Sequence, residues 1–93
     1  MVRELTERDA DTLIAAHIEP HPAHPGITEY RLKVADNGYP VWSVVGSLAP
    51  DGSNVETVAR DFEISTEAIA AVWAFYGRHK RAIDARLASI RAA

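Results

Sequence analysis

A group of histidines near the N-terminal end could do chemistry. It consists of His17, His21 and His24, with Glu19 among them. Imidazole and carboxylate groups bind metal ions, and the step from His17 to His21 would place two rings on one helix face. Pro20 interrupts such a helix because proline lacks the N–H that a helix interior needs. We therefore expect a solvated connector here, and a histidine-dependent metal carrier is the weakest of three functional hypotheses.

The other reactive side chains show no pattern that is typical of an enzyme. Cysteine is absent, which excludes thiol nucleophiles and cysteine-ligated metal centres. The serines have no histidine at a recognisable spacing, the carboxylates form no evident acid–base pair, and no glycine-rich loop could hold a phosphate. We therefore predict that the chain is not an enzyme and that it needs no cofactor.

Charge is distributed unevenly along the chain, although the net charge is only −3. Residues 1–30 carry six acidic and two basic side chains, whereas residues 64–93 carry five basic and two acidic ones. A nucleic acid or another acidic partner would therefore have to meet the C-terminal third. The predicted phosphate contacts are Arg78, Lys80 and Arg81. The predicted contacts to a basic protein partner are Glu7, Asp9 and Asp11.

The length of 93 residues suits one small fold, and a chain of this size buries only about two-thirds of its unfolded surface. Association with a second copy is therefore expected, and we predict a homodimer. Hydrophobic residues make up 47% and charged residues 25%, as in globular domains. No apolar run approaches the roughly 18 residues of a membrane span, and the N-terminus has no apolar signal segment, so we expect a cytoplasmic protein.

Caps, turns and periodicity predict mostly helices. An acidic first turn after Thr6 predicts a helix over residues 6–18. Alternating apolar residues predict a strand over 28–34, which a turn at 36–38 would return as a short strand over 38–40. Further helices are expected over 41–48 (with a strand as the alternative), over 55–62 after an Asn54 cap, over 66–76 after a Ser65 cap, and near the C-terminus. Two units result: an acidic helix with its connector at 1–26, and the hairpin with the remaining helices at 27–93.

The helices predicted over 55–62 and 66–76 match the pattern of a helix-turn-helix. The small residue where two such helices touch is Ala59. Apolar residues flank the turn at Val58 and Ile64, and Ile69 and Val72 supply the inner face of the second helix. At the turn position where glycine is usual, this chain has Glu63, which would carry a steric cost if that position needs a positive φ, so a turn of a different shape is the alternative.

The second of these helices would present its outward face to the major groove of DNA. That face consists of Thr66, Glu67, Ala70, Ala71 and Ala74. It contains none of the Arg, Lys, Asn or Gln side chains that read base edges, and a core without DNA binding is therefore the alternative. Phe75 lies off the main apolar face of the helix, and we predict that it contacts a partner protein.

The ordered set of motifs resembles a widespread family of small prokaryotic proteins described as VapB-like antitoxins. The motifs are HPGI at 24–27, GYPVW at 38–42, VETVARDF at 55–62, AVWAFY at 71–76, RH at 78–79 and IDARL at 83–87. The resemblance implies a mainly α fold with a short β-hairpin, a homeodomain-like helix-turn-helix and a C-terminal helix. It also implies a homodimer that neutralises a PIN-like ribonuclease toxin and represses its own operon by binding promoter DNA.

Two functions therefore stand beside the metal carrier. The first is an antitoxin and DNA-binding regulator, in which Thr66, Glu67, Ala70 and Ala71 face DNA and the acidic N-terminal helix contacts the toxin. The alternative is a homodimeric protein-interaction or assembly module with a degenerate helix-turn-helix and no DNA binding. The acidic net charge and the alanine-lined outer face favour this alternative.

Overall fold

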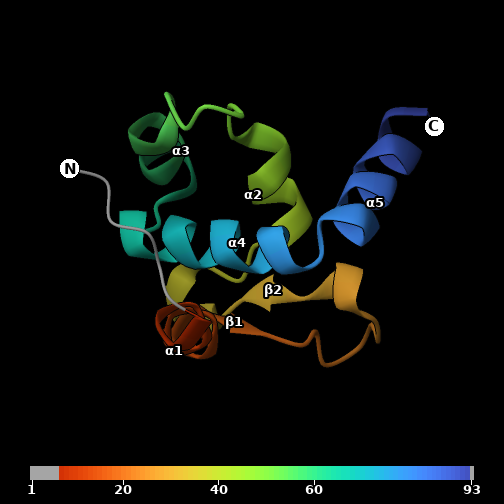
Figure 1. The fold of residues 1–93 in the computed structure, drawn as a ribbon, viewed down its shortest axis with the longest axis horizontal. Coiled ribbons are helices and arrows are strands. Elements are labelled where there is room, and N and C mark those ends of the chain that lie inside the picture. Colours follow the sequence, from red (N-terminus) through yellow and green to blue (C-terminus); the bar gives the residue numbers. More distant parts are fainter. Residues whose placement is uncertain (1–6, 93) are drawn as a thin grey trace.

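The computed structural model describes residues 7–92, and the fold is mainly α (Figure 1). Two short strands form one antiparallel pair, and two single 3₁₀ turns lie on either side of the second strand. In chain order the elements are α1 Glu7–His17, β1 Ile18–Glu19, η1 Ile27–Glu29, β2 Arg31–Leu32, η2 Val34–Asp36, α2 Val41–Ser47, α3 Val55–Phe62, α4 Thr66–Arg78 and α5 Lys80–Ala92.

Helix α4 lies at the centre of the fold and contacts α1, α2, α3 and α5 (Figure 1). Its start agrees with the predicted cap, because the Ser65 hydroxyl accepts a hydrogen bond from the Ala68 N–H at 3.0 Å. The helix continues through Gly77 and ends at Arg78. Contacts on several sides bury five of its residues: Ala68, Ile69, Ala71, Val72 and Phe75.

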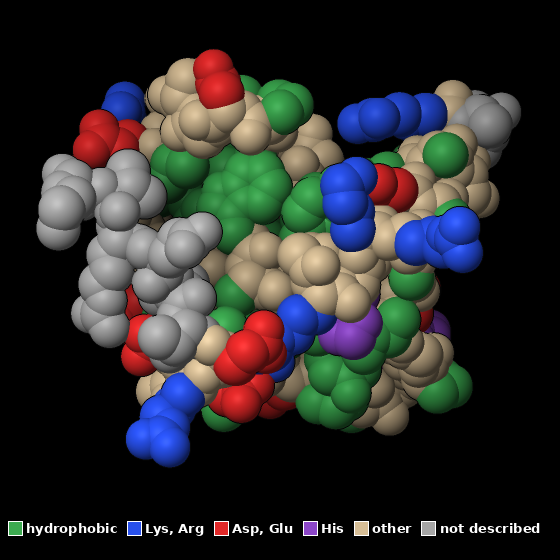
Figure 2. All heavy atoms as spheres, viewed as in Figure 1, with side chains coloured by type: hydrophobic (Ala, Val, Ile, Leu, Met, Phe, Trp, Pro, Cys, Tyr) green, Lys and Arg blue, Asp and Glu red, His purple; other side chains and the backbone are tan. Residues whose placement is uncertain are grey.

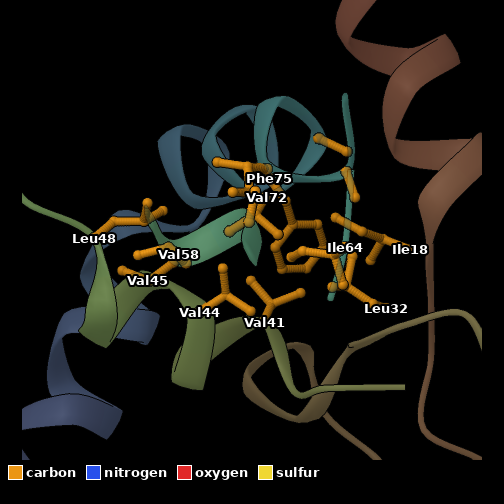
Figure 3. Close-up of a cluster of buried hydrophobic side chains, with 14 of the residues drawn as sticks. Ile18, Leu32, Val41, Val44, Val45, Leu48, Val58, Ile64, Val72 and Phe75 are labelled. Atoms are coloured by element: carbon orange, nitrogen blue, oxygen red, sulfur yellow. The ribbon is translucent and has the colours of Figure 1, made fainter. Parts of the chain in front are cut away.

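The hydrophobic core lies between α2, α4 and the strand pair. Figure 3 shows side chains from these elements pointing toward one another. The largest fully buried side chains are Leu32, Val41, Val44, Ile69, Val72 and Ile83. Burying a side chain of this size stabilises a fold by about 1.5–3 kcal/mol, so this cluster supplies much of the driving force for folding.

The strand pair differs from the predicted hairpin. The partner of β2 is β1, with Ile18 opposite Leu32, and not residues 38–40. The predicted return segment still contacts β2, because the Leu32 N–H donates to the Tyr39 carbonyl at 2.8 Å, but it forms a single bridge at Pro40. Proline has no N–H to continue a ladder, and η2 interrupts the chain before the turn at Asn37.

Two other local predictions have mixed outcomes. Residues 41–47 form a helix and not a strand, and α1 agrees with the helix predicted over 6–18, although the predicted cap Thr6 lies outside the described residues. Asn54 does not cap α3 with its side chain. Instead its side-chain oxygen accepts from the Ala49 N–H and its amide donates to the Ser47 carbonyl, both at 2.8 Å, which closes the turn between α2 and α3.

The two units predicted from the sequence are in contact. Helix α1 packs against α4, and β1 pairs with β2, so elements before and after residue 26 meet at several points. None of the helices in residues 7–92 has the length and apolar character that a membrane crossing requires.

Candidate functional site

The predicted DNA-facing residues of α4 do not share one exposed surface. Thr66 and Glu67 are exposed at the start of the helix, and Ala70 is half-buried. Ala71 is fully buried in the core, so the prediction that it contacts DNA is wrong. The reason is that α4 is covered on more than one side, which leaves no wide outer face.

Phe75 also belongs to the core of its own chain. Its side chain is 3% exposed and stacks on Tyr30 with ring centroids 5.2 Å apart. The prediction that Phe75 contacts a partner is therefore wrong, because the segment that precedes β2 already covers it. An aromatic residue off the main apolar face of a helix indicated a second contact, and that contact lies within the same chain.

Arg78 connects the predicted phosphate contacts to the predicted partner contacts. Its guanidinium donates to Asp11 at 2.6 Å and to the Glu7 carboxylate at 2.9 Å. The hydrogen bond to Asp11 is the main cause that raises the pKa of Arg78. Asp9 is half-buried on the same helix. The positive charge of Arg78, which was predicted to contact phosphate, is thus neutralised by Glu7 and Asp11, which were predicted to contact a partner.

The other two predicted phosphate contacts lie at the start of α5. Lys80 pairs with Asp84 at 2.6 Å, and the Tyr76 hydroxyl donates to the second oxygen of Asp84 at 2.5 Å. The bond from Lys80, and then the bond from Tyr76, lowers the pKa of Asp84, while the bond to Asp84 raises the pKa of both donors. Arg81 is exposed.

His17 forms a second tie between α1 and α4. Its Nδ1 lies 2.8 Å from Asp36 at the end of η2, and its Nε2 lies 2.9 Å from Glu67. Burial lowers the pKa of the imidazole, but the hydrogen bonds and charges of Asp36 and Glu67 outweigh burial and raise it overall. The sequence singled out His17 as a candidate metal ligand and gave no sign of these carboxylate partners.

The remaining histidines of the predicted metal group lie elsewhere. His21 and His24 pack against each other with ring centroids 4.7 Å apart, beside a hollow that also contains Trp42 and Arg86. Arg86 pairs with Glu29 at 3.3 Å. Across the described part of the chain, no three histidine or carboxylate side chains gather closely enough to hold a metal ion.

A groove of about 470 Å³ lies between the end of α2, one face of α4 and α5, and sequence reasoning missed it. Apolar lining comes from Val45, Leu48, Trp73 and Leu87, and polar lining comes from Tyr76, Lys80, Asp84 and Arg91. Figure 2 shows hydrophobic side chains in a hollow beside α2 and α4, with basic and acidic side chains toward α5. The sequence feature that could have indicated this groove is the aromatic pair Trp73 and Tyr76, followed about one turn later by charged residues.

Comparison of the chain with protein-family models, with curated proteins and with solved structures finds no match.

Proposed function

We propose that the chain is a homodimeric protein-interaction module in which α4 is enclosed by neighbouring helices and does not read DNA bases. The contact between α1 and α4 carries this proposal. It pairs Arg78 with Glu7 and Asp11, and it covers α4 on one side. The exposed start of α4 offers Glu67, whose carboxylate repels phosphate.

The acidic side of α1 is the surface best suited to a partner. Glu7 remains 92% exposed and Asp11 68% exposed although both pair with Arg78. Carboxylates in this setting attract a protein with a basic surface, such as the ribonuclease toxin that the family resemblance implies. The charge of α1 thus supports the partner half of the antitoxin hypothesis without requiring DNA binding.

A DNA titration tests the claim that α4 does not read bases. Fluorescence anisotropy of a labelled duplex would be measured at about 50 and 200 mM salt, a range over which phosphate contacts weaken strongly. We expect no saturable binding at either concentration. Tight binding with a steep salt dependence, reduced by about one unit of slope in Arg81→Gln, would overturn the proposal.

A charge exchange tests the partner surface. In the variant Glu7→Lys, Asp11→Lys and Arg78→Glu, the ion pairs within the chain are retained with their signs reversed. A basic partner recovered with the wild-type protein from its host should be lost from this variant. Equal recovery by both proteins would show that α1 is not the contact surface, and circular dichroism would establish that the variant is folded.

A second candidate is the antitoxin that also binds promoter DNA through a helix-turn-helix. The turn between α3 and α4 supports it. Ala59 near the end of α3 and Ile64 within the turn are both buried, and Glu63 adopts φ 56° at the position where glycine is usual. The anisotropy experiment separates the two candidates, because only this one requires DNA affinity.

A further inference from the structure

The groove between α2, α4 and α5 has the size and composition of a small-molecule site. Its volume of about 470 Å³ lies within the range of roughly 300–1,000 Å³ that is typical of ligand pockets. This groove plays no part in the proposed function.

The floor of the groove is apolar and continuous with the core. Val45 is 7% exposed and Leu48 8%, and both belong to the buried cluster. Trp73 and Leu87 are half-buried and present their remaining surface to the groove. A Cβ at Gly46 would lie 3.1 Å from Leu87 Cδ2, so glycine allows α5 to approach α2 closely and form the far wall. A floor fixed by core packing is preformed, which reduces the entropy cost of binding.

The wall of the groove toward α5 carries an excess of positive charge. It contains the cations of Lys80 and Arg91 and the single carboxylate of Asp84. Asp84 already accepts from Lys80 and from the Tyr76 hydroxyl. Lys80 remains 65% exposed and has further N–H donors. Arg91 is also exposed, and it lies close enough to Asp84 to contribute, after Lys80 and Tyr76, to the lowered pKa of that carboxyl.

We propose that this groove binds a small amphipathic carboxylic acid. Its apolar body lies on Trp73 and Leu87, and its carboxylate pairs with Lys80 and Arg91. A neutral molecule of the same shape gains only the apolar contact. An ammonium of the same shape meets the two cations, so the head group decides the order of affinity.

Fluorescence of Trp73 measures this order directly. The full chain carries two tryptophans, and Trp42 lies outside the groove, so Trp42→Phe leaves Trp73 as the sole reporter. Octanoate, octanol and octylammonium share one apolar chain and differ in the head group. We expect a saturable change in emission with octanoate at a concentration about tenfold lower than with octanol, and the weakest response with octylammonium.

Paired variants separate a specific contact from general charge. Lys80→Gln with Arg91→Gln should reduce the affinity for octanoate about tenfold, to that of octanol, and leave octanol unchanged. Arg60→Gln with Arg81→Gln removes the same charge from exposed positions outside the groove and should change neither affinity. Arg91→Gln alone keeps the pair of Lys80 with Asp84 and should lose part of the preference.

Three results would overturn the proposal. One is the absence of a saturable response to octanoate below the concentration at which it forms micelles. Another is equal affinity for the three probes, which would show that the groove binds only the apolar chain and does not recognise the carboxylate. The last is an equal loss in both variant pairs, which would assign the effect to net charge. Far-UV circular dichroism of each variant accompanies the titrations.

Discussion

The contact of His17 with two carboxylates makes the stability of the fold depend on pH. The raised pKa means that the folded chain holds the imidazole proton more tightly than the unfolded chain, whose ordinary pKa is 6.5. The stabilisation is therefore fully present below pH 6.5 and is lost as the pH rises through the higher pKa of the folded state. Of the charged groups nearby, Asp36 and Glu67 favour the protonated form of the His17 imidazole. The ammonium of Lys33 donates its hydrogen bond to the Ala15 carbonyl.

The size of the effect follows from the exposure of the partners. His17 is 12% exposed and Asp36 18%, and a charge-assisted bond between such groups contributes about 1.5 kcal/mol. Glu67 is 69% exposed, so its bond contributes about 0.5 kcal/mol. We expect His17→Gln to lower the free energy of unfolding by about 2 kcal/mol near pH 5.5 and by much less near pH 8.5. For a chain of this length, 1 kcal/mol shifts the melting temperature by about 4–8 °C.

Thermal unfolding followed by circular dichroism between these pH values measures the effect. The informative quantity is the difference in melting temperature between wild type and His17→Gln at each pH. Glu67→Gln removes the weaker bond and should give a smaller difference of the same sign. A difference that is constant, or that grows as the pH rises, would refute the reasoning.

Three further substitutions test packing and turns by urea denaturation. Phe75→Ala should lower the free energy of unfolding by about 3–5 kcal/mol because the side chain is 3% exposed, and a loss below about 1 kcal/mol would contradict a core position. Glu63→Gly should raise it by about 0.5–1 kcal/mol, since glycine adopts φ 56° without a steric cost, and a loss of stability would show that the Glu63 side chain contributes more than this strain. Asn54→Ala should lower the free energy of unfolding by about 2 kcal/mol. Asn54→Asp keeps the acceptor for Ala49 but has no donor for Ser47, so its stability should lie between those of wild type and Asn54→Ala. Equal stabilities of the two variants would contradict a role for both bonds.

Features carried by neighbouring residues could be predicted from the sequence. The cap at Ser65, the helix around Val58 and Ala59, and the turn at Asn37 depend on residues within a few positions, and each occurs in the structure. Asn54 was predicted as a cap because asparagine is common there. The same side chain also suits a turn, and the chain that folds back from α2 offers it two partners.

Features that depend on distant partners could not be predicted in this way. The pairing of β1 with β2 joins Ile18 to Leu32 without a hairpin turn between them. The apolar residues of α4 indicated a main buried face and a second contact at Phe75, but only the packing of distant segments around the helix shows that Ala71 and Phe75 are buried within the same chain. The groove is likewise formed by three helices, so the aromatic pair on α4 could not by itself outline it.

The charged residues illustrate why separate functional surfaces were predicted where the fold has one contact. Arg78 and Asp11 are 67 residues apart in the chain, and each appeared to need a partner of opposite charge outside it. The fold satisfies both by joining α1 to α4, and His17 with Glu67 adds a second tie between the same helices. The two ties respond differently to pH, because salt screens the exposed carboxylates Glu7, Asp11 and Glu67 in both, whereas only the tie through His17 depends on a group with a pKa near neutrality. Raising the pH at low salt should therefore weaken the tie through His17 and leave the tie through Arg78, whereas raising the salt concentration at low pH should weaken both.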